Sequence, residues 1–199
     1  PYDLKFLIDE FGDLFTGYIT FNGQYCYDST GKILHEEYLN REDLIQFTNY
    51  IKDKDIACGF MEMDYFYFNL YNDRLAKLKE TLGDTAPDRA FDDVSRVCNH
   101  KTYQLNIFLN EDEVLPYLPN CKAVRWCPYF TDIIPKDGGK GTGIKKVLAY
   151  YGIDINEAMA FGDGGNDVEM LEAVKYGIAM GNANDNLKQI ADFITLDVD

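Results

Sequence analysis

The sequence predicts an α/β protein: a Rossmann-like core with a parallel sheet, interrupted by an inserted α+β domain. Two observations carry this prediction. Residues 131–195 alternate short apolar strands with amphipathic helices, the rhythm of a doubly wound parallel sheet. Residues 26–125 contain strands and helices without that alternation. We therefore expect a discontinuous core, residues 1–25 and 126–199, and a separate domain formed by residues 26–125.

The N-terminal part begins with a predicted helix over residues 1–11, because its apolar residues recur at helical spacing. A short strand follows at residues 18–21 and ends at the turn dipeptide Asn22-Gly23. Residues 24–28 and 32–39 read as the two arms of a hairpin. Asn40 then caps a helix whose apolar face contains Leu44, Phe47 and Ile51.

The rest of the inserted domain is expected to hold a strand over 56–63, a long helix over 66–82 and a strand over 103–110. In this last strand apolar and polar residues alternate strictly, which indicates a sheet with one buried face. A short helix at 111–118 and a strand at 121–126 complete the domain. Beyond it we expect core strands at 131–134, 158–161, 178–180 and 193–195, and helices at 144–151, 168–174 and 184–190.

Composition excludes several classes of partner. The chain has 34 acidic and 19 basic residues, a net charge of −15, so it would repel nucleic acid and anionic lipid. No apolar run approaches the roughly 18 residues that a bilayer span requires. The five cysteines form no C-x-x-C pair and predict reduced thiols. Together with the lack of a leader sequence, they predict a cytoplasmic protein.

The densest group of reactive residues is the glycine-rich run Gly162-Asp163-Gly164-Gly165-Asn166-Asp167, between a predicted strand and a predicted helix. It matches neither a dinucleotide fingerprint nor an EF-hand loop. Two carboxylates and an amide on such a turn suit Mg²⁺, which binds through one or two carboxylates and retains waters or phosphate oxygens. An ordinary strand-to-helix turn, with Asp167 near the helix N-terminus, is the alternative.

A second run, residues 136–143, places Lys140 among glycines, again between a strand and a helix. It is not a P-loop, because Gly141 stands where that motif has Ser or Thr. A lysine at a helix N-terminus forms an anion site from its charge, the backbone N–H groups and the dipole, although a solvated lysine has the same pattern. Because the two runs occupy successive strand-to-helix turns along the chain, we expect them to converge on one phosphoryl group.

These residues resemble the haloacid dehalogenase (HAD) superfamily, in its Cof-type branch. The resemblance is carried by Gly162–Leu171, by Ala179-Met180-Gly181-Asn182-Ala183 and by Ala191-Asp192-Phe193-Ile194-Thr195. Lys140-Gly141 matches the family's phosphate lysine, and Ile19–Gly23 matches the strand that leads into its inserted cap. The implied fold is a Rossmann-like core with a C2-type α+β cap.

The resemblance implies a Mg²⁺-dependent phosphomonoesterase that works through an aspartyl-phosphate intermediate. Asp163 and Asp167 would be the metal residues, with Asp167 holding either the metal's water shell or the lysine. Lys140 would neutralise charge on the phosphoryl group. Lys140, Asp163 and Asp167 together form the implied catalytic set. The implied substrate-binding set is Asn22, Gly23, Arg125, Lys140 and Asn166.

The sequence departs from the family at the nucleophile, because it contains no D-x-D-G-T motif. In family members this motif lies upstream of the residue that matches Pro1. We therefore expect that the nucleophile lies outside this chain and that the chain, as it stands, is incomplete and inactive. A catalytically silent phosphate-binding or regulatory module is the alternative, and a sugar-phosphate mutase is a third reading.

The expected substrate is a small phosphate ester, a sugar phosphate, whose leaving group is selected by the cap. Arg125, at the return from cap to core, is the expected polar anchor, and Trp126 stands beside it. The aromatic residues around 60–71 favour core packing of the cap over a stacking wall. We expect a monomer or a weak dimer.

Overall fold

The computed structural model describes residues 5–83 and 90–197, which form two compact units. Unit 1 contains residues 38–136, and unit 2 contains the described residues up to Glu37 and from Asp137 onward. The units therefore divide at 37/38 and 136/137, whereas the sequence predicted 25/26 and 125/126. The hairpin of residues 24–36 belongs to unit 2, and residues 126–136 belong to unit 1.

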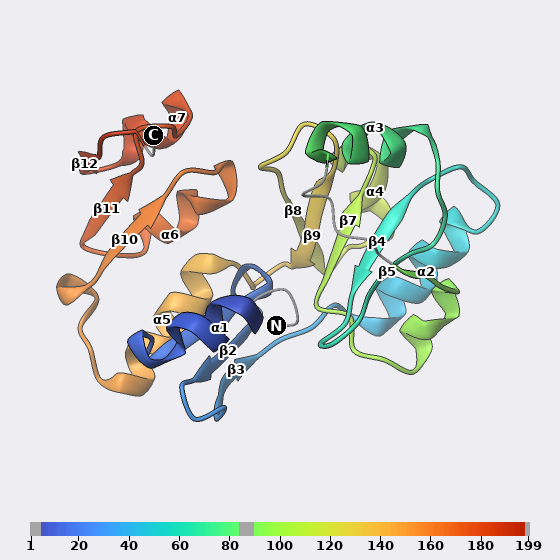
Figure 1. Ribbon diagram of the computed structural model, residues 1–199. Coiled ribbons are helices and arrows are strands. Elements are labelled where there is room, and N and C mark those ends of the chain that lie inside the picture. Colours follow the sequence, from blue (N-terminus) through green and yellow to red (C-terminus); the bar gives the residue numbers. More distant parts are fainter. Residues whose placement is uncertain (1–4, 84–89, 198–199) are drawn as a thin grey trace. The chain divides into compact units, whose positions relative to one another are not determined.

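Unit 1 is built on a six-stranded sheet in the order β6-β5-β4-β7-β9-β8 (Figure 1). All neighbours pair antiparallel except β5 and β6, which are parallel. The strands are β4 (Cys58–Met61), β5 (Phe66–Phe68), β6 (Ala90–Phe91), β7 (Gln104–Ile107), β8 (Cys121–Val124) and β9 (Thr131–Pro135).

Strand β9 corrects one sequence prediction. Residues 131–134 were expected to be a core strand of the parallel sheet, but β9 lies between β7 and β8 and is antiparallel to both. A fully buried apolar strand has the same residue pattern in either kind of sheet. The distinguishing signal is the short connection of residues 125–130 from β8, because a parallel neighbour needs a crossover of a dozen or more residues.

The described residues of unit 1 form three α-helices: α2 (Arg41–Ile51), α3 (Asp73–Leu82) and α4 (Glu111–Val114). The predicted cap of α2 is confirmed, since Asn40 Oδ1 accepts hydrogen bonds from the backbone N–H groups of residues 42 and 43. The helix expected over 66–82 is wrong in its first part. Phe66-Tyr67-Phe68 is strand β5, as its aromatic residues favour, and Asn72 caps α3 by accepting from Leu75 N–H.

The two faces of the unit 1 sheet differ in character. On one face α2 contributes to the main apolar core, together with side chains of the central strands such as Phe60, Leu105 and Ile133. A second apolar cluster contains Phe68 of β5, Leu75 of α3 and Phe108. Both faces of β7 are therefore buried, which corrects the expectation of a single buried face for this strand.

Unit 2 combines an antiparallel sheet with a parallel one. Strands β1 (Gly17–Thr20), β2 (Tyr25–Asp28) and β3 (Ile33–Glu36) are antiparallel in that order, and β2 and β3 form the predicted hairpin. Strands β10 (Met159–Gly162), β11 (Tyr176–Ala179) and β12 (Phe193–Ile194) are parallel, as the sequence predicted for these segments. The helices of this unit are α1 (Lys5–Phe11), α5 (Lys140–Tyr151), α6 (Val168–Glu172) and α7 (Asp185–Ile190).

Helices α6 and α7 connect the strands of the parallel sheet, and Leu171, Ala179, Ala183 and Leu187 form their shared core. The helix expected over residues 1–11 is present from Lys5, and residues 1–4 lie outside the described residues. The fold is thus an α/β unit together with an α+β unit inserted between its two parts. Within 5–83 and 90–197, no helix has both the length and the apolarity that a membrane span needs.

Candidate active site

Four loops of unit 2 bring the predicted site residues together. They are the turn after β1, the N-terminus of α5, the loop after β10 and the loop after β11. Strands β10 and β11 are parallel neighbours, so both of their loops leave from the carboxyl edge of the same sheet. Ligands of open α/β sheets bind at this edge.

The loop after β10 is folded around the carboxylate of Asp167. One oxygen, Oδ2, accepts hydrogen bonds from the backbone N–H groups of Asp163 at 3.0 Å and Gly164 at 2.9 Å. Asp167 is 4% exposed, and its Cβ lies where a side chain on Gly162 would clash, at 2.6 Å from an ideal Cβ. Glycine at position 162 therefore lets this carboxylate close the loop.

Lys140 is the first residue of α5, and its ammonium forms an ion pair with the other oxygen of Asp167, Oδ1. Helices α5 and α6 pack closely at Gly141, where a Cβ would be only 2.6 Å from the carbonyl oxygen of Glu169. This close packing brings Lys140 next to Asp167. The structure thus brings Lys140 and Asp167 together, as the sequence led us to expect. The lysine side chain remains 27% exposed and accessible to a ligand.

The turn after β1 approaches the same region through an unusual backbone. Phe21, Asn22 and Gly23 have successive positive φ values of 50°, 52° and 98°. The first two are uncommon for residues with a side chain and cost free energy. Asn166 Nδ2 donates to Asn22 Oδ1 at 3.1 Å, which links this turn to the loop after β10. Gly23 packs on the N-terminus of α5, and a Cβ there would lie 2.1 Å from Gly139 O.

Asp163 is the exposed carboxylate of the loop. Its Oδ2 accepts a hydrogen bond from Asn182 Nδ2, at 3.1 Å, in the loop after β11. Asn182 belongs to the motif Ala179–Ala183, but the resemblance implied no role for it. Its position directly after the next parallel strand was the available signal.

The donor set determines which metal ion the site suits. The described residues contain no group of three or more His, Cys, Asp or Glu side chains arranged to hold a metal. Both oxygens of Asp167 accept hydrogen bonds from protein groups, which leaves the exposed Asp163 as the carboxylate available to a ligand. One carboxylate fits Mg²⁺, whose other positions are filled by waters and phosphate oxygens.

Arg125 belongs to unit 1, where its guanidinium braces the loop between β8 and β9. Its Nε donates to Glu111 Oε1 at 2.6 Å, and its terminal nitrogens donate to the carbonyl oxygens of Leu109, Cys127 and Phe130. The hydrogen bond from Arg125 holds the pKa of Glu111 below its ordinary value. Its contacts are therefore with the protein, and a direct contact with substrate stays a prediction.

Comparison with known proteins identifies the relatives of this chain. A profile of haloacid dehalogenase-like hydrolases matches residues 1–199. Over 99 residues the chain is 46% identical to the putative phosphatase YkrA of Bacillus subtilis, covering 49% of this chain and 38% of that protein. Over 140 residues it is 33% identical to the 5-amino-6-(5-phospho-D-ribitylamino)uracil phosphatase YitU of the same species, covering 67% and 47%.

Among solved structures, that of the HAD subclass IIB sugar phosphatase BT4131 matches with a TM-score of 0.83 and 31% sequence identity. The match covers 97% of this chain and 74% of that one. The matched segments span less than half the length of the two curated phosphatases. The profile match covers all 199 residues, and the structural match covers nearly the whole chain. The chain belongs to the family of haloacid dehalogenase-like hydrolases.

Proposed function

We propose that this chain is part of a Mg²⁺-dependent phosphomonoester hydrolase that acts on a small phosphate ester, a sugar phosphate. The observation that carries the proposal is the pairing of Lys140 with Asp167 beside the exposed carboxylate of Asp163. A fixed cation and a carboxylate suited to Mg²⁺, both next to a helix N-terminus, form a site for a phosphoryl group. A chain with a net charge of −15 otherwise repels such an anion.

Lys140 supplies electrostatic stabilisation in this proposal. Asp167 holds the ammonium in place before substrate arrives, so little reorganisation is needed when charge develops on the phosphoryl oxygens. The lysine is also the first residue of the twelve-residue helix α5, whose N-terminal dipole favours the same anion. Asn22, Gly23 and Asn166 complete the binding edge, and we retain Arg125 as a residue that shapes substrate binding through the loop it braces.

Asp163 is the proposed direct metal ligand, oriented by Asn182. Asp167 is the proposed second metal residue, acting through the loop that it closes and through the metal's water shell. When bound, Mg²⁺ would neutralise negative charge on the phosphoryl oxygens and orient them.

The proposed nucleophile is an aspartate outside residues 1–199, since the sequence has no D-x-D-G-T segment. Its carboxylate oxygen forms a bond to phosphorus while the ester oxygen leaves and takes up a proton. Water then hydrolyses the acyl phosphate, which releases phosphate and restores the carboxylate. Residues 1–199 alone are therefore expected to bind phosphate without releasing it from esters.

The names of two relatives support the substrate class. One solved neighbour is described as a sugar phosphatase, and one curated relative as a phosphatase of a phosphorylated ribitylaminouracil. Both substrates are small phosphate esters with polyhydroxylated carbon chains. For this chain we propose the same class, in a cytoplasmic protein that is a monomer or a weak dimer.

The test compares residues 1–199 with the chain as encoded, including any sequence upstream of Pro1. Phosphate release from a panel of hexose and pentose phosphates is measured with Mg²⁺ and with a chelator. We expect release only from a chain that carries an upstream aspartate, and only with Mg²⁺. Lys140→Met and Asp163→Asn should each lower kcat by about 100-fold or more.

Lys145→Met is the matched control, because Lys145 is an exposed residue of the same helix, and this variant should keep full activity. If the encoded chain lacks an upstream aspartate, or binds phosphate but hydrolyses no ester, the hydrolase proposal fails. A silent phosphate-binding module is then the correct reading.

A further inference from the structure

We propose that the C-terminal motif Ala191–Thr195 positions Asn182 against Asp163, the carboxylate proposed to bind Mg²⁺, and that Thr195 is the positioning residue. The motif carries part of the family resemblance, which implied no role for it. Its effect on Mg²⁺ rests on the proposed function. The placement of Asn182 rests on contacts within unit 2 alone.

The motif holds both ends of strand β11. At the start of the strand, Asp192 N–H donates to Gly177 O at 2.8 Å, and Asp192 Oδ2 accepts from Gly177 N–H at 2.9 Å. At the end of the strand, Thr195 N–H donates to Ala179 O at 2.9 Å. Between these contacts β12 and β11 are parallel neighbours (Figure 1). The motif therefore fixes the point at which the loop after β11 begins.

The hydroxyl of Thr195 extends this contact into the loop. Gly181 N–H donates to Thr195 Oγ1 and to the carbonyl oxygen of Leu196, both at 3.2 Å. The hydroxyl itself donates to Leu196 O at 2.7 Å, so it also holds the second acceptor in place. A Cβ on Gly181 would be only 2.4 Å from the backbone nitrogen of Asp197. Glycine at this position therefore permits the close approach of the two backbones.

Gly181 lies in a β-turn that presents Asn182. Ala183 N–H donates to Met180 O at 2.9 Å and closes the turn. Met180 N–H donates to Gly162 O at 2.9 Å, which attaches the first residue of the turn to β10. Because Gly181 and Asn182 are the two central residues, the bonds to Gly181 N–H orient the part of the turn that carries the asparagine.

The hydrogen bond from Asn182 depends on this support. Asn182 and Asp163 are both exposed, so water competes for the bond of 3.1 Å between Nδ2 and Oδ2. Ordering two free side chains costs conformational entropy, and less remains to be lost where their backbones are already fixed. Asp167 fixes the backbone of Asp163, and Thr195 fixes the turn of Asn182. Replacing groups that orient a metal ligand commonly lowers metal affinity by about 10–100-fold.

The alternative role for Thr195 is stabilisation of the parallel sheet without any effect on the site. In that case, a loss of Mg²⁺ affinity in a Thr195 variant would be independent of Asn182. A positioning role acts only through the side chain of Asn182. A double-mutant cycle between Thr195 and Asn182 distinguishes the two roles.

The first measurement needs no metal and follows the side-chain amide resonances of Asn182 by NMR in the 199-residue chain. Asp163→Ala removes the acceptor and should shift these resonances. Thr195→Val keeps the shape of the side chain but removes its hydroxyl, and it should move the resonances toward the same position. Thr195→Ser retains a hydroxyl and should leave them close to their native position.

The second measurement is a titration with Mg²⁺ alone, followed by the backbone amide resonances of the loop after β10. Because a chain of net charge −15 also attracts Mg²⁺ over its whole surface, shifts that remain in Asp163→Ala are treated as diffuse binding. Asn182→Ala should weaken binding at the site by about tenfold. Thr195→Val should weaken it by about fivefold, and Thr195→Ser by less than about twofold.

The cycle is completed by the double variant. In the Asn182→Ala background, Thr195→Val should change the affinity for Mg²⁺ by no more than about 1.5-fold. If Thr195→Val does not fold, Gly181→Ala provides the same comparison, because its Cβ separates the loop from the chain after β12. Thr30→Val is the matched control, since Thr30 is an exposed residue of unit 2 whose hydroxyl also makes a local hydrogen bond. It should leave both measurements unchanged.

Two results would overturn the proposal. The first is an unchanged Asn182 amide in both Thr195→Val and Gly181→Ala. The second is an equal loss of Mg²⁺ affinity from Thr195→Val with and without Asn182, which would assign the motif a purely structural role. A native chain that binds no Mg²⁺ at Asp163 would contradict the proposed function instead, and the metal-free measurement would then decide the positioning of Asn182 by itself.

Discussion

Lys140 and Asp167 lie 27 residues apart in the sequence and form a direct ion pair through Oδ1 of the aspartate. The second carboxylate oxygen of Asp167 accepts hydrogen bonds from two backbone N–H groups. One buried side chain thus fixes both the cation of α5 and the shape of the loop after β10. The loop and the helix are therefore expected to respond together to a change at Asp167.

Asp167→Asn should loosen the loop after β10. The substitution removes the charge partner of Lys140 and replaces one acceptor oxygen with an amide that cannot accept from N–H. We expect a loss of about 1–3 kcal/mol of local stability, which is below the roughly 3–5 kcal/mol for a fully buried ion pair because the lysine is partly exposed. Amide hydrogen exchange of residues 163 and 164, whose N–H groups lose their acceptor, is the measurement.

Asp163→Asn is the control for that measurement, since Asp163 is exposed and its carboxylate is held by a single amide group. This variant should change the free energy of local opening, measured by amide hydrogen exchange in the loop, by less than about 0.5 kcal/mol. Equal protection loss in the two variants would contradict the assignment of Asp167 as the residue that closes the loop.

Gly23→Ala should be much more damaging than Gly31→Ala. Both glycines have positive φ, 98° and 86°, so both substitutions carry a similar backbone penalty of about 1 kcal/mol. At Gly31 a new Cβ meets open space, whereas at Gly23 it would lie 2.1 Å from Gly139 O. We expect the difference in free energy of unfolding between the two variants, measured in urea, to exceed about 2 kcal/mol.

The sequence predicted the convergence of Lys140 and Asp167 because each stands in a recognisable glycine-rich run before a helix. The premise that both runs leave strands of one sheet was wrong, since β9 belongs to the sheet of unit 1, and the close packing of α5 on α6 brings the two residues together. Asn182 received no role for a related reason. Its place after a predicted strand indicated the edge of the sheet but not a partner, because Asp163 lies 19 residues away and the pairing of β10 with β11 brings the two together. Local motifs are readable from one sequence, and tertiary partners of single polar residues are not.

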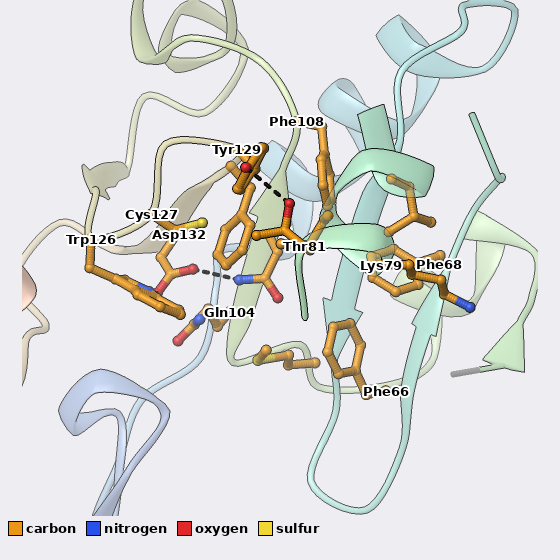
Figure 2. A pocket seen from close by; sticks show the side chains of 15 residues that line it. Phe66, Phe68, Lys79, Thr81, Gln104, Phe108, Trp126, Cys127, Tyr129 and Asp132 are labelled. Carbon is orange, nitrogen blue, oxygen red and sulfur yellow. Dashed lines mark hydrogen bonds between the residues drawn. The ribbon is translucent and has the colours of Figure 1, made fainter. Parts of the chain in front are cut away.

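The strand β7 shows a second limit. Alternation of apolar and polar residues predicted one buried face, yet Gln104 and Asn106 lie on a face that is also buried. Polar residues at alternate positions occur both on a strand face exposed to solvent and on one that forms the floor of a cavity. Here α3 and the loop of residues 126–130 cover this face (Figure 2), and the sequence of β7 alone does not reveal that cover. Strand β9 was assigned to the wrong sheet because a run of buried residues fits a parallel or an antiparallel sheet equally well.

Arg125→Gln should raise the pKa of Glu111, because the guanidinium N–H that stabilises the ionised carboxylate is lost. In the native protein this pKa lies below the ordinary value of 4.5, so the stabilisation is present above 4.5 and disappears as pH falls through the lowered pKa. The stability difference between native chain and variant should therefore shrink from about pH 6 to about pH 3. NMR titration of Glu111 measures the pKa directly.

Arg74→Gln is the matched control for the pH dependence, because Arg74 donates to a backbone carbonyl, that of Phe108, at 2.6 Å. Its stability cost should be independent of pH over the same range. A cost of Arg125→Gln that is equally flat would show that the bonds of Arg125 to carbonyl oxygens, and not its ion pair with Glu111, account for its contribution.

The five cysteines should divide into one reactive thiol and four protected ones. Cys98 is exposed, and the other four are buried. Burial raises the pKa of Cys26 and of Cys121 to about 12, and it also raises that of Cys58. At about pH 8 very little thiolate forms at these sites, and the reagent reaches them only through opening of the fold. We expect a disulfide reagent to label one thiol per chain at least about 100-fold faster than the others. The rapid phase should be lost in Cys98→Ser. In denaturant, all five thiols should be labelled. A second rapid equivalent that survives in Cys98→Ser would contradict the burial of these side chains.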